Sequence, residues 1–287
     1  MLPDVSAFFD DATQTVTYLV VDPSTRAAAI IDPVLDYDPA SGRTSTASDQ
    51  RLLAAVQQGG LTVEWLLETH VHADHLSGAP WLKQHVGGRI AIGEHIREVQ
   101  KVFAALFSAE PSFITDGRQF DHLFADGETF RLGAIEGRAL HTPGHTPACM
   151  TYLIGDAAFV GDTLFMPDFG TARADFPGGD AAALYRSIQR IFTLPDATRV
   201  FTAHDYKAPG RDTYAWESTI AEQRAHNVHA HAGVTEAEFV ALRTARDATL
   251  GMPRLILPSV QINMRAGERP PPEANGTSYL KIPLDKL

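Results

Sequence analysis

The chain has 287 residues, of which 44% are hydrophobic and 21% charged, a composition typical of a globular protein and not of a disordered or fibrous one. Its formal net charge of −11 would repel a polyphosphate, so we expect no nucleic-acid partner. The single cysteine, Cys149, excludes an intrachain disulfide framework, an all-cysteine zinc site and an iron–sulfur cluster held by one chain.

The predicted elements begin with two strands. Residues 15–21 (TVTYLVV) are β-branched and aromatic, and residues 27–31 follow after an Asp-Pro-Ser-Thr turn. We interpret residues 43–48 as a polar loop. The segment 49–58 is predicted to be a helix, which Gly59-Gly60 ends.

Strands and helices then alternate. Apolar spacing predicts strands at 63–68, 89–92 and 199–203, and helices at 80–86, 94–107, 181–192, 214–228 and 235–249. Residues 121–159 are rich in strands, with turns marked by glycine. Because several strands follow one another without a helix between them, the pattern predicts layered sheets covered by helices.

The chain shows no change of composition that would mark a domain boundary. We therefore expect one domain over 1–287, with a helical and extended C-terminal extension from about residue 208. No apolar run is long enough to cross a bilayer, and no basic segment leads into an apolar stretch at the N-terminus. These features predict a cytoplasmic protein without membrane contact.

The strongest local signal is a cluster of metal-binding side chains directly after the predicted strand at 63–68. Residues 69–75 have the sequence THVHADH, which places four candidate ligands within six positions: His70, His72, Asp74 and His75. Imidazole and carboxylate groups are ligands of zinc and of non-haem iron. A continuous helix would put His72 and His75 on one face and leave out His70. We therefore expect a turn at the strand end, which can aim all four side chains at one cavity.

Three more segments place a His or an Asp just beyond a predicted strand. The segment HTPGHT contains His141 and His145, a Gly-Asp pair contains Asp162, and the segment AHDY contains His204. Loops held by a rigid sheet are where binding groups are normally placed. Each segment is weak evidence alone, but together with the His-rich turn they form a specific constellation.

In order and spacing, these motifs resemble the metallo-β-lactamase superfamily over roughly 15–206. The match is closest to the persulfide dioxygenases and to the bacterial β-lactamase-like hydrolases linked to sulfide detoxification. It is carried by HADHLSGAPWLK, IGEHI, HTPGHTPAC, VGDTLFMPDFGTARADFPGGD and HDYKAPGR. The resemblance implies an α/β fold, an αββα sandwich of two mixed sheets flanked by helices, with a metal site at one edge of the sheets.

The resemblance also implies a role for each candidate ligand. In the persulfide dioxygenases, the matching positions hold one Fe(II) per chain through His70, His145 and Asp162. Two imidazoles and one carboxylate leave the other coordination positions of the metal open for O2 and substrate. The remaining superfamily positions orient the site and are matched here by His72, Asp74, His75 and His204. The family pattern gives His141 no ligand role, so it stays a candidate either to support the site or to serve the fold alone.

The implied reaction is the oxidation of glutathione persulfide by O2 to sulfite and glutathione. Glutathione carries two carboxylates, so we expect a cationic rim near the iron. Arg173 and Tyr206 match positions where the family lines its substrate pocket, and Lys207 and Arg211 are candidates because they lie near His204 in the sequence. Related proteins are often dimers, which leaves a homodimer open.

The main alternative is a binuclear zinc hydrolase of the glyoxalase II type, which acts on a glutathione thioester. One Zn(II) would be held by His70, His72 and His145, and the other by Asp74, His75 and His204, with Asp162 between them. All seven residues are present for both functions, so ligand spacing alone does not choose between them. A binding module without catalysis is disfavoured because no ligand position is missing, and a nuclease conflicts with the acidic charge.

We expect one cysteine and three further histidines to serve the fold and not the site. We expect Cys149 to be a buried and inert thiol. The trio His226, His229 and His231 is expected at the C-terminus of a helix, where cationic or polar side chains are favourable.

Overall fold

The structure, a computed structural model, describes residues 2–286 and contains two six-stranded sheets packed face to face. The first sheet has the order β1-β2-β3-β6-β8-β9. Its strands are β1 (Asp4–Asp10), β2 (Thr15–Val21), β3 (Ala27–Ile31), β6 (Thr62–Leu67), β8 (Arg89–Gly93) and β9 (His122–Phe124). The pairs β1–β2 and β2–β3 are antiparallel, whereas β3, β6, β8 and β9 run parallel. Parallel pairing brings the C-terminal ends of β3 and β6 to the same edge.

The second sheet is antiparallel except for the pair β13–β14, which is parallel. In spatial order its strands are β10 (Thr129–Leu132), β11 (Ile135–His141), β12 (Met150–Ile154), β13 (Ala157–Phe159), β14 (Arg199–Phe201) and β15 (Glu217–Thr219). A small third sheet, ordered β5-β4-β7, contains β4 (Val34–Asp38), β5 (Arg43–Ser45) and β7 (Leu76–Ser77).

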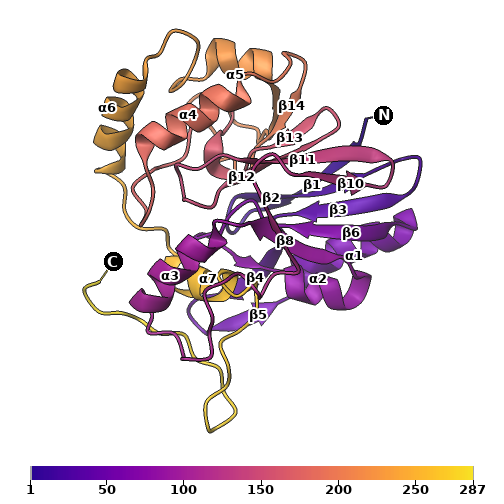
Figure 1. Ribbon diagram of the computed structural model, residues 1–287, viewed down its shortest axis with the longest axis vertical. Helices are drawn as coiled ribbons and strands as arrows, with labels where there is room; N and C mark the ends of the chain where they lie inside the picture. Colours follow the sequence, from indigo (N-terminus) through magenta and orange to yellow (C-terminus); the bar gives the residue numbers. More distant parts are fainter. Residues whose placement is uncertain (1, 287) are drawn as a thin grey trace.

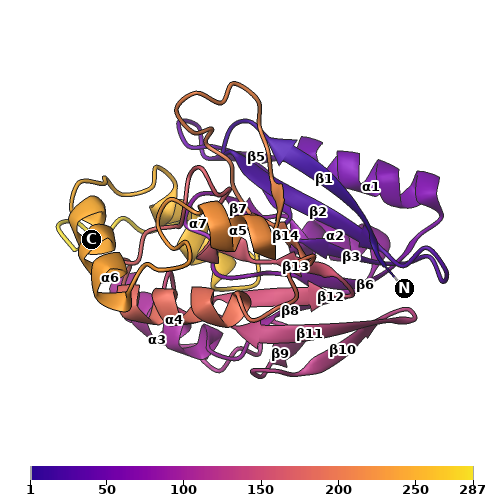
Figure 2. The same ribbon diagram turned by 90° about the horizontal axis from the view of Figure 1, so that it is seen from above.

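Helices cover both outer faces of the paired sheets, as Figures 1 and 2 show. They are α1 (Ala47–Gly59), α2 (Ala79–Val86), α3 (Ile96–Leu106), α4 (Ala181–Ile191), α5 (Ile220–His226), α6 (Glu236–Asp247) and α7 (Ile256–Asn263). Helices α1 and α2 lie on the side of the first sheet, and α4 and α5 on the side of the second. This arrangement confirms the αββα sandwich. Within residues 2–286, no helix is long and apolar enough to span a membrane.

The core follows from the alternation of side chains along the strands. In β3 and β6, Ile30 and Leu66 pack toward the helices, whereas Ile31 and Leu67 pack into the layer between the sheets. Strand residues alternate between the two faces of a sheet, so a strand covered on both sides is apolar throughout. A third cluster lies between the second sheet and helices α4 to α6. Each buried Leu or Ile contributes about 1.5–3 kcal/mol, which holds the strand ends in place.

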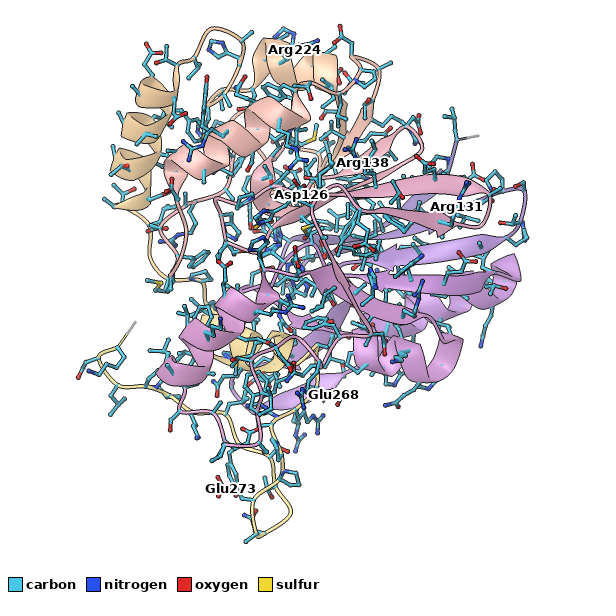
Figure 3. The ribbon with its side chains drawn as sticks, in the orientation of Figure 1. Asp126, Arg131, Arg138, Arg224, Glu268 and Glu273 are labelled. Carbon is cyan, nitrogen blue, oxygen red and sulfur yellow. The ribbon has the colours of Figure 1, made fainter. Side chains whose placement is uncertain are left out.

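Charged side chains occupy the outer surface of this sandwich (Figure 3). Arg131 and Arg138 are exposed on the β10–β11 hairpin, and Glu268 and Glu273 are exposed on the C-terminal segment after α7. The expectation of one domain over 1–287 stays a prediction, and residues 1 and 287 lie outside the described part of the chain.

The structure corrects two expectations about the elements. Part of the loop expected at 43–48 is strand β5, which pairs with β4 at the edge of the small sheet. The helix expected at 214–228 covers only α5, because residues 217–219 are strand β15. Thr219 has an extended backbone, and its side chain accepts a hydrogen bond from the Glu222 N–H, so the helix begins after Thr219.

Strands β1 and β4 and helix α7 were not predicted from the sequence. Strand β1 is partly exposed at the edge of the first sheet, so its apolar alternation is weak. Helix α7 is buried on most sides, which removes the amphipathic spacing that identifies a surface helix.

Candidate metal centre

The His-rich segment is a turn directly after β6, as expected, and not a helix. It is fixed at its start by Asp32, which lies at the end of β3. The Asp32 carboxylate accepts hydrogen bonds from the Thr69 N–H at 2.7 Å and from the Thr69 hydroxyl at 2.8 Å. Both groups are buried. Because β3 and β6 are parallel neighbours, this bond ties together the two strand ends from which the turn departs.

The three predicted iron ligands come together at the edge of the two sheets. His70 belongs to the turn, His145 lies in the β11–β12 loop, and Asp162 follows β13 in the short 3₁₀ helix η1 (Gly161–Thr163). The Asp162 Oδ2 atom lies 4.0 Å from His70 Nε2 and 3.5 Å from His145 Nε2. One ligand atom from each residue lies within 4.8 Å of the others.

A glycine makes this approach of separate segments feasible. Gly161 has a φ of +51°, and a Cβ atom there would lie 2.6 Å from Thr69 Oγ1. A side chain at this position would therefore push η1 and Asp162 away from the turn that carries His70.

A second set of ligand atoms adjoins the first. His204, which follows β14, has its Nε2 atom 3.4 Å from Asp74 Oδ2 and 3.4 Å from Asp162 Oδ1. His72, Asp74 and His75 offer atoms within 4.8 Å of one another. Asp162 thus has one carboxylate oxygen near each set. All seven residues predicted from the sequence are close together in space.

Hydrogen bonds determine which ring nitrogen of each histidine is free. The Nδ1–H of His145 donates to the Arg173 carbonyl at 2.8 Å, and that of His204 donates to the Gln14 carbonyl at 3.1 Å. His75 Nδ1 lies 3.0 Å from the Asp74 carboxylate. Each contact leaves Nε2 as a lone pair that faces the centre of the site.

In His70 and His72 too, one ring nitrogen contacts a partner in the chain and the other faces the centre. Asp32 is involved in both contacts. The Thr69 hydroxyl donates to Asp32 and therefore accepts from His70 Nδ1, at 3.0 Å. His72 Nε2 lies 3.0 Å from Asp32 Oδ1 and 3.4 Å from Glu68 Oε2, which leaves Nδ1 for the centre. Asp32 thus orients two candidate ligands.

Eleven buried side-chain polar atoms in the described part of the chain have no hydrogen-bond partner, and five of them converge on this centre. The set includes His70 Nε2, His72 Nδ1, His75 Nε2, His204 Nε2 and Asp162 Oδ1. An unpartnered buried polar atom costs about 1–3 kcal/mol, so a concentration of them calls for a missing partner. Imidazole nitrogens and carboxylate oxygens are the donors that Zn(II) and Fe(II) take. The residues present therefore fit a metal.

Electrostatics agree with a cation at this position. Burial holds the pKa of His70 well below its usual range, so its ring is neutral, the form that binds a metal. Burial opposes ionisation of Asp74, but His204 and His75 outweigh it and hold the pKa of Asp74 well below its usual range. Burial likewise opposes a charge on His72, but the Asp32 carboxylate raises the pKa of His72 well above its usual range. A metal would compete with a proton for His72 Nδ1.

A cavity of about 470 Å³ opens over the centre. Asp74, His145 and Asp162 line its floor, and Phe165, Phe169 and Phe176 contribute aromatic walls. The cavity thus combines candidate metal ligands with aromatic and arginine side chains.

The predicted substrate residues divide into two pairs. Arg173 and Tyr206 line the cavity. Lys207 and Arg211 lie outside its lining. Lys207 sits 4.2 Å from the centre of the Tyr214 ring, and Arg211 forms ion pairs with Asp205 and Asp168. The guanidinium of Arg173 is itself committed to Asp175 and to the Gly251 carbonyl.

Sequence reasoning missed three cavity arginines from the C-terminal part of the chain: Arg243, Arg246 and Arg254. Arg243 is buried and bonded to Asp247 and to the Thr171 carbonyl. Arg246 and Arg254 form no ion pair or side-chain hydrogen bond in the described residues, so their charges are available to a ligand. The only sequence feature that could have indicated these arginines is the pair Arg243 and Arg246 in the helix predicted at 235–249.

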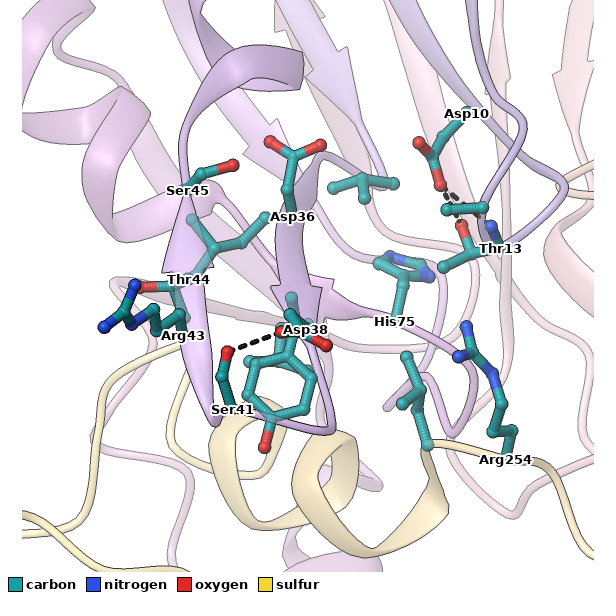
Figure 4. A pocket seen from close by; sticks show the side chains of 16 residues that line it. Asp10, Thr13, Asp36, Asp38, Ser41, Arg43, Thr44, Ser45, His75 and Arg254 are labelled. Carbon is teal, nitrogen blue, oxygen red and sulfur yellow. Dashed lines mark hydrogen bonds between the residues drawn. The ribbon is translucent and has the colours of Figure 1, made fainter.

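Arg254 also borders a second cavity, of about 570 Å³. Asp36, Asp38 and His75 line this space with it (Figure 4). Arg254 and Leu255 therefore line both cavities, of which the first contains Asp74 and Asp162 and the second contains His75 and different acidic side chains.

The residues given structural roles behave mostly as expected. Cys149 is buried, and burial raises the pKa of its thiol to about 12. The Nε2–H of His141 donates to the Pro147 carbonyl, 2.8 Å away, and the ring stacks on His95, outside the metal cluster. The prediction for His229 is wrong. Only His226 ends a helix, whereas His229 is buried and its Nδ1 accepts a hydrogen bond from the Thr171 N–H.

The chain matches the family model of the metallo-β-lactamase superfamily over residues 10–204. It is 60% identical to a protein of Burkholderia pseudomallei (strain 1710b) named a probable metallo-hydrolase, over 99% of both chains. It is 48% identical to glyoxylase B2 of Dictyostelium discoideum, over 99% of this chain and 97% of that one. Identity to the mitochondrial persulfide dioxygenase ETHE1 of Homo sapiens is 33%, over 92% and 88%.

The solved structure of ETHE1 from Myxococcus xanthus superposes on this fold with a TM-score of 0.72 at 32% identity, covering 92% of this chain and all of that one. The chain also spans 65% of the length of a β-lactamase hydrolase-like protein of Xylella fastidiosa. The names of these relatives include a hydrolase, a glyoxylase and a dioxygenase, so they do not agree on one reaction.

Proposed function

The chain belongs to the metallo-β-lactamase superfamily, and we propose that it is an Fe(II)-dependent persulfide dioxygenase. One glutathione persulfide, one O2 and one water would give glutathione, sulfite and two protons. His70, His145 and Asp162 would hold one Fe(II). The observation that carries the proposal is the convergence of these two imidazoles and one carboxylate beside a ligand-sized cavity that His145 and Asp162 line.

The bound metal would supply open coordination positions and the redox chemistry that O2 requires. The chain's own residues would position the substrate. The aromatic walls would limit access of water to the reacting end of the cavity, and Arg246 and Arg254 would present unpaired cations to the carboxylates of glutathione. Binding at both ends would orient the persulfide sulfur toward the metal, which lowers the entropic cost of the reaction.

The residues around the ligands would hold the metal in one geometry. Asp32 orients His70 through Thr69 and contacts His72 directly. The carbonyl groups of Arg173 and Gln14 hold His145 and His204 in the tautomers that expose Nε2. In this proposal His72, Asp74, His75 and His204 support the iron site rather than bind a second metal.

A binuclear zinc hydrolase of a glutathione thioester is the second candidate. It is favoured by the position of Asp162, whose two oxygens face different groups of ligand atoms, at 3.5 Å from His145 and 3.4 Å from His204. The relative named glyoxylase B2, at 48% identity, is also more similar than the human persulfide dioxygenase, at 33%.

Metal analysis of anaerobically purified protein, combined with O2 uptake, separates the two functions. We expect about one iron per chain and rapid O2 consumption with glutathione persulfide. Asp162→Ala should lose the iron, whereas Asp168→Ala, whose exposed carboxylate lies outside the cluster, should retain it. Two zinc ions per chain, no O2 uptake and hydrolysis of a glutathione thioester would establish the second candidate instead.

A further inference from the structure

The last residue of α7 has all its side-chain hydrogen bonds directed at the metal-ligand turn. Asn263 is buried, and its Nδ2 group donates to the carbonyl oxygens of His72 at 2.9 Å and His75 at 2.8 Å. Its Oδ1 atom accepts from the Ser77 N–H at 2.8 Å. One side chain from the C-terminal part of the sequence thus holds two positions of the turn and one position of strand β7, which follows it.

The turn has little backbone support of its own. In the described structure, residues 70–75 form no hydrogen bond between backbone groups. The turn is anchored at its start by Asp32 through Thr69, and at its far end by Asn263. Because Asn263 bonds to the backbone of His72 and His75, it acts directly on the positions of two candidate ligands.

Helix α7 is firmly placed for this role. Val260 and Met264 belong to the core beneath the first sheet. Gly267, with a φ of +88°, lies so close to the start of α2 that a Cβ atom would lie 2.6 Å from Pro80 Cδ. Gln100 of α3 donates to the Met264 carbonyl at 2.9 Å. The end of α7 therefore cannot shift to follow a movement of the turn.

We propose that Asn263 is a positioning residue for the metal centre, through which the C-terminal helix sets the affinity of the His-rich turn for a metal. The role rests on the proposed metal site, but on neither the identity of the metal nor the substrate. Side chains and backbone bonds that orient metal ligands typically change metal affinity by about 10–100-fold.

Titration of the metal-free protein with Co(II) alone, followed by visible absorption, tests this role without any catalytic assay. Asn263→Ala is expected to bind Co(II) about 10-fold more weakly, with altered ligand-field bands. Gln261→Ala is the matched control, since it removes a buried amide side chain of the same helix whose hydrogen bonds go to Leu257 and Lys281 and not to the turn. Its Co(II) affinity should stay within about 2-fold of the wild type, even where the two variants lose similar thermal stability.

Equal Co(II) affinity and spectra in Asn263→Ala and the wild type would overturn the role, as would an equal loss in Gln261→Ala. If Asn263→Ala does not fold, Asn263→Asp replaces it, because the carboxylate keeps the acceptor for Ser77 and removes the donation to the two carbonyls. A wild-type chain that binds no Co(II) would instead overturn the proposed metal centre itself.

Discussion

The surroundings of one buried carboxyl group near the His-rich turn disfavour its ionised form. Asp49, in the first turn of α1, is fully buried, and neither of its oxygens has a hydrogen-bond partner in the described residues. Burial, together with the nearby charges of Asp36 and Glu68, raises the pKa of Asp49 to about 8. The unfolded-state pKa is about 3.9. The folded state therefore loses stability as the pH rises from about 4 toward 8.

Asp49→Asn should stabilise the protein near neutral pH. The amide carries no charge, so the gain in unfolding free energy should be larger at pH 8 than at pH 5, on the order of 1–3 kcal/mol at pH 8. Thermal unfolding at both pH values measures it. Asp38→Asn should gain nothing, because the exposed Asp38 carboxylate accepts bonds from Ser41 and Ala40. A pH-independent effect of Asp49→Asn would contradict the assigned pKa.

Helix α6 connects the C-terminal part of the chain to the cavity. A capping box starts it, in which Thr235 and Glu238 each bond to the backbone N–H of the other. Farther along, Asp247 pairs with Arg243 and accepts from the Ala174 N–H at 2.9 Å. With both ends fixed, the helix presents Arg246 to the cavity as an unpaired cation.

Arg246→Ala should raise the KM for an anionic substrate by about 10-fold, because a charge-assisted hydrogen bond contributes about 1.5–3 kcal/mol. The kcat should change little, since Arg246 is not one of the candidate metal ligands. Steady-state kinetics measure both constants. Arg186→Ala, on α4 and paired with Glu236 outside the cavity, is the matched control. A fall in kcat without a change in KM would exclude a role in substrate binding.

Considered as a whole, the molecule places its metal centre across the junction of the two sheets. The His-rich turn extends from the first sheet, and His145, Asp162 and His204 follow strands of the second. A metal would thus add a connection between two layers that also meet through apolar packing and through hydrogen bonds such as that from the Tyr152 hydroxyl to the Glu68 carbonyl. Ligand binding to the folded state alone stabilises it in proportion to the logarithm of the free ligand concentration over Kd.

Removal of the metal should therefore lower the thermal stability of the entire fold. A free metal concentration of about 1,000 times Kd contributes about 4 kcal/mol, and each kcal/mol corresponds to about 2–4 °C in Tm for a large domain. We expect chelation to lower Tm by on the order of 10 °C, measured by calorimetry. The Asp162→Ala variant should respond much less. Equal Tm values with and without chelator would show that the ligands bind no stabilising ion.

The candidate metal ligands, which stay a prediction, could be proposed from the sequence because each is a chemically distinctive residue at the end of a strongly apolar strand. The strands 15–21 and 27–31 were predicted with their observed bounds, since residues buried on both faces leave a continuous apolar pattern. The chemistry of His70, His145 and Asp162 was equally visible, because short motifs carry it.

The contacts between distant segments could not be obtained this way. Lys207 and Arg211 are neighbours of His204 in the sequence but lie outside the cavity, whereas Arg246 enters it from a later helix. Asn263 reaches the turn across nearly 190 residues, since its bonds to His72 and His75 span separations of 191 and 188 positions. The local sequence pattern indicates whether a residue is buried and which chemical groups its side chain carries. Which buried groups meet depends on how the layers pack, because packing and hydrogen bonds join atoms that are close in space and far apart along the chain.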